Sequence, residues 1–210
     1  MKTALVIGAG PAGLMAAEEL AAAGLQVIVC DAMPSVGRKF LMAGKSGLNL
    51  TMDVDQGAFL GAFPTLPPAL RAALDGFGPM QVKDWAQGLG QDVFTGSSGR
   101  VFPTAMKASP LLRAWLRRLV EAGVTFRLRW RWTGWSGGDA VFDTPEGQQT
   151  VAPDVTILAM GGASWSRLGS NGTWATQFFD LTTPFQPANV GFMVSWSDHM
   201  TRHFGSAVKG

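Results

Sequence analysis

Cysteine, charge and long apolar runs are all scarce in this chain. The single cysteine, Cys30, excludes an internal disulfide framework and a cysteine-rich zinc site. Charged residues make up 15% of the 210 residues, against about 25% in a typical soluble domain. With 17 basic and 15 acidic residues the net charge is +2, which is too small to indicate nucleic acid or a membrane as a partner.

The apolar runs are short as well. None approaches the ~18 residues of a membrane span. Glycines and Pro11 interrupt the apolar stretch near the N-terminus, so its pattern is not that of a signal peptide. We therefore expect a cytoplasmic protein with a reduced thiol and no membrane association.

Hydrophobic residues and glycine are plentiful. The hydrophobic fraction of 47% excludes a disordered chain and allows a sizeable core. The 27 glycines show no period of three, so they indicate tight turns and close approaches of the backbone. At roughly 150 residues per domain, the length corresponds to one domain and part of another.

The N-terminal third begins with a strand–helix–strand unit. Thr3–Ile7 is a short apolar run, and Leu25–Cys30 is a second one. The alanine- and leucine-rich segment Leu14–Ala23 between them predicts a helix that ends at Gly24. A unit of this length predicts a parallel strand pair with a right-handed crossover, as in an α/β, Rossmann-like domain.

The rest of the sequence predicts loops, helices and further strands. Residues 32–66 are rich in glycine and predict loops, and helices are expected at Pro67–Leu74, Pro79–Leu89 and Ser109–Ala122. Ser109 is expected to cap the last of these helices, with Pro110 in its first turn. Turn signals separate three strand-like runs that predict a small antiparallel meander, namely Val124–Trp135, Ala140–Thr144 and Gln148–Val151. Further strand-like runs lie at Val155–Ala159 and Gly191–Val194.

The first motif with chemical meaning is the G-x-G-x-x-G run Gly8–Gly13, which lies between the first strand and the helix. Gly8 permits the tight turn, Gly10 lets the backbone approach a pyrophosphate, and Gly13 lets the helix pack close to the strand. Asp31, at the end of the second strand, would accept hydrogen bonds from a ribose and repel a 2′-phosphate. The motif therefore predicts a dinucleotide site, for either FAD or NAD, and disfavours NADP.

Two further segments suit a bound anion. Arg38 and Lys39 begin the small-residue segment Gly37–Thr51 and could neutralise pyrophosphate oxygens, although a solvated basic loop is the plain alternative. The strand Val155–Ala159 runs into Gly161 and Gly162, where the backbone can approach a ligand closely.

An alternating basic and apolar run, RLRWRW, competes with this interpretation by suggesting single-stranded nucleic acid. Strand alternation would place the arginines on one face and the aromatic residues on the other, so bases could not stack on the aromatic rings. The arginines are Arg127, Arg129 and Arg131. His199 and His203 have helical spacing without a supporting ligand set, so no metal site is predicted.

Taken together, these motifs resemble flavoproteins of the glutathione-reductase type. More narrowly, the chain resembles a bacterial family of NAD(P)/FAD-dependent oxidoreductases related to dehydro-bile-acid reductases. The narrower resemblance depends on Gly37–Thr51, on Gly99–Pro103 followed by Lys107, and on Gly161–Ser164 with Gly169 and Ser170.

The resemblance implies FAD at the first motif. It implies the pyrophosphate at Gly10–Gly13, the adenosine ribose at Asp31, and the backbone near Trp132 against the adenine. It also implies that Gly161 closes over the cofactor and that Ser46 to Asn49 approach the flavin. The expected cofactor-binding residues are thus Gly8, Gly10, Pro11, Ala12, Gly13, Asp31, Arg38, Lys39, Ser46, Asn49, Trp132 and Gly161.

The function implied is that of an FAD-dependent oxidoreductase that transfers a hydride between flavin and a small organic substrate, with NAD(P)H as a candidate electron donor. No catalytic residue is assigned. The alternatives are an NAD-dependent dehydrogenase, an FAD-dependent tRNA-modifying protein and an inactive fragment.

The resemblance also implies a domain division. Residues 1–186 are expected to form the FAD-binding domain, with a helical insert at about 55–95. Residues 187–210 are expected to begin a second, truncated substrate domain, so that the chain is the N-terminal part of a longer flavoprotein.

Overall fold

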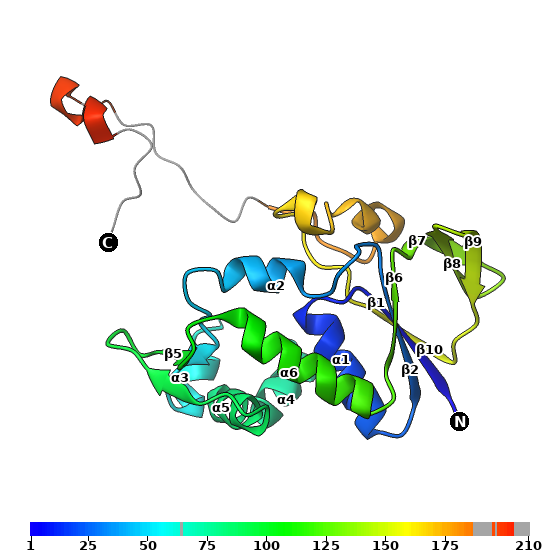
Figure 1. Cartoon of the computed structure of the whole chain (residues 1–210), viewed down its shortest axis with the longest axis horizontal. Helices are drawn as coiled ribbons and strands as arrows, with labels where there is room; N and C mark the ends of the chain where they lie inside the picture. Colours follow the sequence, from blue (N-terminus) through cyan, green and yellow to red (C-terminus); the bar gives the residue numbers. More distant parts are fainter. Residues whose placement is uncertain (64, 187–194, 196, 204–210) are drawn as a thin grey trace.

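The computed structural model describes residues 1–63, 65–186, 195 and 197–203 (Figure 1). The strand-like run expected at Gly191–Val194 lies outside the described residues, as does most of the expected second-domain segment 187–210. Within the described part of the chain, no helix has both the length and the apolar character needed to cross a membrane.

A four-stranded parallel sheet is the centre of the fold. Its strands are β1 (Thr3–Ile7), β2 (Gln26–Asp31), β6 (Thr125–Leu128) and β10 (Val155–Leu158). They are arranged in the order β10-β1-β2-β6, with every neighbouring pair parallel. Helix α1 (Pro11–Ala22) connects β1 to β2, so the predicted strand–helix–strand unit is confirmed.

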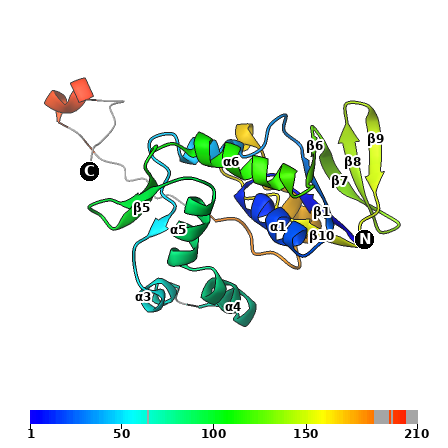
Figure 2. The same cartoon turned by 60° about the horizontal axis from the view of Figure 1, so that its bottom comes forward.

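Both faces of the parallel sheet are covered, by different kinds of structure. Helices α1 and α6 (Ala108–Glu121) lie on one side, and a meander lies on the other (Figures 1 and 2). The meander strands are β7 (Arg131–Ser136), β8 (Asp139–Thr144) and β9 (Gly147–Val151), which pair antiparallel in that order. The predicted fold class, an α/β Rossmann-like domain with a central parallel sheet and a three-stranded meander, is therefore confirmed.

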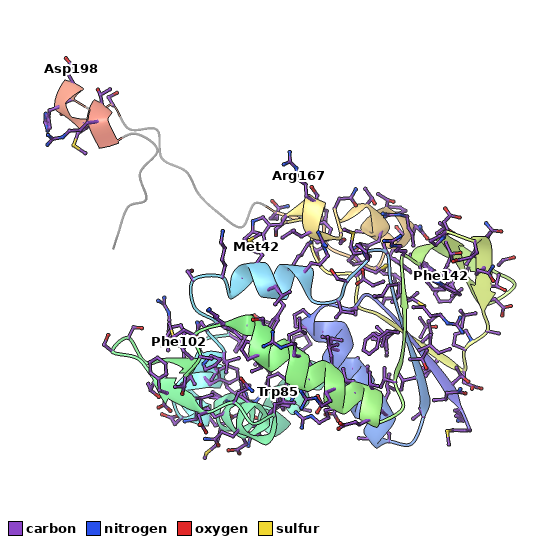
Figure 3. All side chains as sticks on the ribbon, in the orientation of Figure 1. Met42, Trp85, Phe102, Phe142, Arg167 and Asp198 are labelled. Carbon is purple, nitrogen blue, oxygen red and sulfur yellow. The ribbon has the colours of Figure 1, made fainter. Side chains whose placement is uncertain are left out.

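The side-chain alternation of β1 explains why both faces can be covered. Ala4 and Val6 join the apolar cluster beneath the helices, together with Trp115. Leu5 and Ile7 join the cluster beneath the meander, which also holds the large side chain of Phe142 (Figure 3). Successive residues of a strand point to opposite faces, so a continuous apolar run is what a sheet buried on both sides requires.

The segment between β2 and α6 forms a peripheral part of the molecule. It contains α2 (Arg38–Ala43), β3 (Thr51–Met52), α3 (Gln56–Gly61), α4 (Pro68–Gly76), α5 (Pro79–Gly88), β4 (Val93–Thr95) and β5 (Arg100–Pro103). The three strands form an antiparallel sheet in the order β3-β5-β4. Helices α3 and α4 lie at the edge of this peripheral part that is farther from the parallel sheet (Figure 2). Helices α3 to α5 fall within the helical insert expected at about 55–95, while the division into domains stays a prediction. The loops expected at 32–66 are interrupted by α2, β3 and α3.

After β10 the chain continues in short 3-10 helices. These are η1 (Ser166–Leu168), η2 (Thr173–Phe178) and η3 (Asp198–His203).

The expected single strand Val124–Trp135 is wrong, because the chain turns in its middle. Arg129 has a positive φ of 60°, in the left-handed region. Its N–H donates to the Met33 carbonyl at 3.2 Å, and the Trp130 N–H donates to the Asp31 carbonyl at 2.9 Å. These bonds leave β6 in the parallel sheet and direct β7 into the meander.

The turn also overturns the expectation that three arginines share one strand face. Arg127 lies in β6, Arg129 in the turn and Arg131 in β7. The Arg127 guanidinium lies 4.6 Å from the centre of the Trp130 ring, a cation–π contact within the chain.

The predicted cap of α6 is also wrong. The helix starts at Ala108, after the extended residue Lys107, and no side chain caps it. Pro110 still lies in the first turn, where its absent N–H costs nothing.

One carboxylate joins three helices. The Oε2 atom of Glu18, on α1, accepts the indole N–H of Trp115 at 2.6 Å and that of Trp85 at 3.2 Å. The Nε of Arg118 lies 3.2 Å from Glu18 Oε1, at the distance of an ion pair but without the alignment of a hydrogen bond. Trp85 lies at the junction of α5 and α6, where its ring meets the Trp115 ring edge-on (Figure 3).

Replacing Glu18 with alanine should therefore destabilise the fold. The change leaves two indole N–H groups without an acceptor, so we expect a loss of about 3 kcal/mol in the free energy of unfolding. Urea unfolding followed by tryptophan fluorescence measures this loss. Glu19→Ala, at the exposed neighbouring position, is the control and should change the free energy by less than about 0.5 kcal/mol. Equal losses from the two substitutions would contradict the role of Glu18 as the acceptor that joins the three helices.

Candidate functional site

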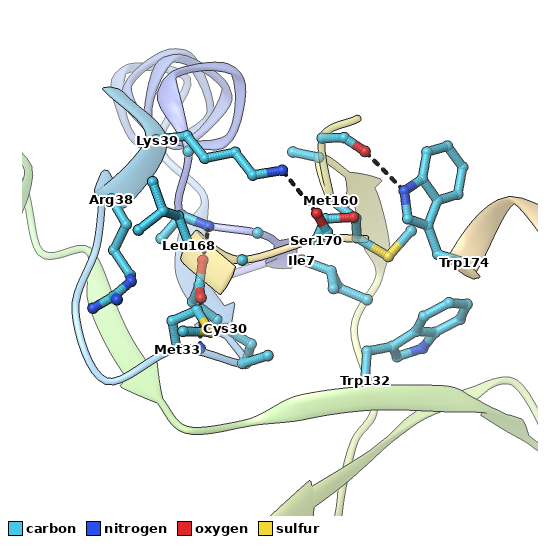
Figure 4. Close-up of a pocket in the computed structure, with 18 of the residues that line it drawn as sticks. Ile7, Cys30, Met33, Arg38, Lys39, Trp132, Met160, Leu168, Ser170 and Trp174 are labelled. Carbon is cyan, nitrogen blue, oxygen red and sulfur yellow. Dashed lines mark hydrogen bonds between the residues drawn. The ribbon is translucent and has the colours of Figure 1, made fainter. Parts of the chain in front are cut away.

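A crevice of about 640 Å³ opens at the carboxyl ends of the parallel strands. Its walls come from the β1–α1 turn, the end of β2, the start of α2, the β6–β7 turn and the segment that follows β10. Figure 4 shows side chains from these segments converging on the cavity. This is the position where open parallel sheets bind ligands.

The β1–α1 turn forms one side of the crevice and depends on two very close backbone approaches. Gly8 has a φ of 110°, and a Cβ there would collide with the Ala159 carbonyl. A Cβ on Gly13 would collide with the Gly8 carbonyl, so α1 can pack against the end of β1 only with glycine there. A Cβ on Gly10 would meet nothing within 4 Å, since the backbone there borders the open crevice.

Asp31 is held rigidly at the end of β2. Its Oδ2 accepts the N–H of Ala9 at 2.7 Å, and its Oδ1 accepts the N–H of Met33 at 2.7 Å. The carboxylate thus ties the β1–α1 turn to the segment after β2. Each carboxylate oxygen has a second lone pair, which suits the hydroxyl groups of a ribose.

Two buried donors at the crevice have no hydrogen-bond partner among the described residues: the Nε of Arg38 and the Nε1 of Trp132. Buried polar atoms are almost always paired, so such atoms at a cavity wall indicate a ligand that supplies acceptors. Arg38 also donates from Nη1 to Ser35 Oγ at 3.3 Å, and the Trp132 ring is stacked on Phe178 with centres 6.0 Å apart. The two donors fit a dinucleotide, which carries phosphate oxygens and ring nitrogens.

Lys39 borders the crevice but is already engaged. Its Nζ donates to the Gly162 carbonyl at 2.9 Å and to the Ser170 carbonyl at 2.8 Å (Figure 4). Burial lowers the pKa of its ammonium group from the ordinary value, because desolvation penalises the charge.

The structure brings most of the predicted site residues together. Those that border the crevice are Gly8, Gly10, Pro11, Ala12, Asp31, Arg38, Lys39, Trp132 and Gly161. Their contacts with a cofactor stay predictions.

Three predicted site residues, Gly13, Ser46 and Asn49, do not border the crevice. Gly13 lies inside α1 and serves the helix–strand contact. Ser46 and Asn49 follow α2, where the neighbouring Leu48 is buried in the core beside Gly44 and Ala108. Their contacts with a cofactor stay predictions as well.

Sequence reasoning missed Trp174, whose Nε1 donates to the Gly161 carbonyl at 2.8 Å (Figure 4). Trp174 follows the glycine- and serine-rich stretch that indicated a ligand site, and no pattern in the neighbouring sequence predicts its role. Among the described residues, no group of three or more His, Cys, Asp or Glu side chains could hold a metal ion.

The fold and the crevice define a Rossmann-type dinucleotide-binding domain. Residues 2–185 match the family of HI0933-like protein Rossmann domains, and the chain belongs to this FAD-binding family. The expected family and its cofactor, FAD, are therefore confirmed.

The ribosomal RNA dihydrouridine synthase of Escherichia coli (strain K12) is similar to this chain, with 28% identity over 169 residues. The match covers 80% of this chain and 41% of the relative, so the chain spans about two-fifths of that protein's length.

Two solved structures show the same fold. The 3-ketosteroid-delta4-(5alpha)-dehydrogenase of Rhodococcus jostii RHA1 matches with a TM-score of 0.55 and 17% identity, over 77% of this chain and 46% of that one. The open conformation of a flavocytochrome c3 fumarate reductase matches with a TM-score of 0.51 and 23% identity, over 77% of this chain and 34% of that one.

Cys30 borders the crevice and should nevertheless be unreactive. Burial of the thiol raises its pKa to about 12, so at pH 8 only about one molecule in ten thousand carries the thiolate. We expect iodoacetamide at pH 8 to leave the native protein unmodified over a time that fully modifies the urea-unfolded chain, as measured by intact mass. Rapid modification of the native protein would contradict the burial of this thiol.

Proposed function

We propose that this chain is the FAD-holding part of a cytoplasmic oxidoreductase that acts on a small organic substrate, with NAD(P)H as the electron donor. The observation that carries the proposal is the crevice at the sheet's carboxyl edge, lined by an open glycine backbone, a fixed carboxylate and two residues with orphaned buried donors. Membership of an FAD-binding family supports FAD over NAD in that cavity.

The residues of the crevice have distinct parts in holding the cofactor. The pyrophosphate would lie close to the Gly10 backbone at the start of α1. The positive end of the helix dipole would stabilise its charge. Asp31 would bind ribose hydroxyls, and the Arg38 Nε and Trp132 Nε1 would each donate to a cofactor oxygen or nitrogen. Bound FAD supplies the hydride chemistry, while the protein orients the cofactor and excludes water.

Gly10→Ala should separate cofactor binding from folding. Its added methyl group meets no protein atom within 4 Å, and the φ of −81° at this residue suits alanine, so the fold should keep its stability. The methyl group would occupy the space in which a pyrophosphate approaches the backbone, so we expect FAD binding to weaken by about tenfold or more. Absorbance spectra after desalting and an FAD fluorescence titration measure the binding.

Gly61→Ala is the matched control, because a Cβ on this glycine of α3 also meets nothing within 4 Å and the residue lies outside the crevice. It should bind FAD as the unmodified chain does. Unchanged binding by Gly10→Ala would show that the pyrophosphate lies elsewhere. An unmodified chain that ignores FAD and binds NADH would reopen the dehydrogenase alternative.

A second candidate function is reduction of a uracil ring within RNA, and the similarity to the Escherichia coli ribosomal RNA dihydrouridine synthase favours it. Such a reduction adds a hydride to one carbon of the ring's C=C bond and a proton to the other. The same crevice would serve, with the RNA base as the organic substrate. The Arg127 side chain adds little support for RNA binding, because its guanidinium is stacked on Trp130 of the same chain.

Mass spectrometry of in vitro transcribed ribosomal RNA distinguishes the two candidates. For the RNA candidate, incubation with the FAD-loaded chain and NAD(P)H should raise the dihydrouridine content above that seen with Gly10→Ala. RNA binding should also weaken steeply with salt. Oxidation of NAD(P)H by small enones without any dihydrouridine would favour a small-molecule substrate.

A further inference from the structure

Lys39 joins two parts of the molecule that are far apart in the sequence. It belongs to α2, and its Nζ donates to carbonyl groups 123 and 131 residues later, those of Gly162 and Ser170. One ammonium group therefore holds both ends of the segment 162–170, which we term the wall segment. Figure 4 shows the Lys39 side chain extending from α2 toward this segment.

The wall segment forms one side of the crevice and has little packing of its own. Ser166, Leu168, Gly169 and Ser170 border the cavity. From Gly162 to Arg167 every residue is exposed, and Trp165 is 54% exposed with a left-handed φ of 52°. A segment with few buried apolar contacts opens easily, so its position depends on polar bonds such as those from Lys39.

The chemistry of the ammonium group suits such a tie. It has three N–H donors, and the two carbonyl bonds use two of them. Bonds from a charged donor are stronger than neutral ones, particularly where water is partly excluded. Lys39 itself borders the crevice, and one of its three donors is not used by the two carbonyl bonds.

We propose that Lys39 is a positioning residue, which holds the wall segment against the cofactor crevice and offers its third N–H to an oxygen of the bound dinucleotide. The effect on the cofactor rests on the proposed function, whereas the tie to the wall segment does not. Lys39 would thus add a structural tie to the part that the sequence suggests for it, the neutralisation of pyrophosphate charge.

The test compares Lys39→Met with Lys39→Arg and with the control Lys45→Met, which changes an exposed lysine two residues after α2. Trypsin cleavage after Arg167, inside the wall segment, is followed by mass spectrometry in the absence of cofactor. Lys39→Met should speed this cleavage several-fold, and Lys39→Arg, which can still donate to both carbonyls, should restore most of the protection. Lys45→Met should behave as the unmodified chain.

FAD titrations of the same variants test the second half of the proposal. Loss of charge-assisted bonds should weaken FAD binding by about tenfold or more in Lys39→Met, with substantial rescue in Lys39→Arg. Saturating FAD should slow cleavage after Arg167 in the unmodified chain. This comparison, with and without FAD, does not depend on the folding of any variant.

Two outcomes would overturn the proposal. Unchanged cleavage in Lys39→Met would show that the wall segment is held without Lys39. Faster cleavage with unchanged FAD affinity would show that the wall segment does not matter to the cofactor. If cleavage is unchanged while FAD binding weakens, Lys39 contacts the cofactor directly and does not hold the wall segment. If the unmodified chain does not bind FAD, the proposed function fails, while the cleavage comparison still decides the role of Lys39 in the apo chain.

Discussion

The close approach of α1 to the end of β1 is the contact on which the rest of the structure depends. Gly13 lies against the Gly8 carbonyl, and Gly8 lies against the Ala159 carbonyl after β10, so three segments meet with no room for a side chain. The contact places the start of α1 at the carboxyl edge of the sheet. It also aligns β1 with β10, since the N–H of Ala159 donates to the Ile7 carbonyl at 2.8 Å. The crevice is the space that remains beyond this junction.

Local sequence was enough to predict this junction and its neighbours. Apolar runs, a helix-forming segment and glycines at fixed spacing define β1, α1 and β2, because all the interactions they need lie within about 30 residues. Asp31 was predictable for the same reason, since it follows β2 directly.

The parts that escaped prediction depend on partners far along the chain. The break between β6 and β7 is caused by bonds from Arg129 and Trp130 to the segment around Asp31, about a hundred residues earlier. In the same way, Lys39 donates to the carbonyl groups of Gly162 and Ser170, and no local sequence pattern predicts these bonds. Ser46 and Asn49 do not border the crevice, and their part in binding the cofactor stays a prediction; their neighbour Leu48 packs into the core.

In the proposed site a carboxylate, Asp31, would stand beside a bound pyrophosphate, and the electrostatics of the crevice allow this. Asp31 would repel phosphate oxygens if its charge were free, but each of its oxygens already accepts a backbone N–H. These bonds orient the carboxylate and offset part of its charge, and the positive end of α1 lies at the same edge. The residual negative charge still opposes a 2′-phosphate, which would add charge at the ribose itself. In the proposed site Asp31 would therefore select the form of the dinucleotide, while the helix start and the Arg38 guanidinium would provide affinity for it. Different groups would then meet the two requirements.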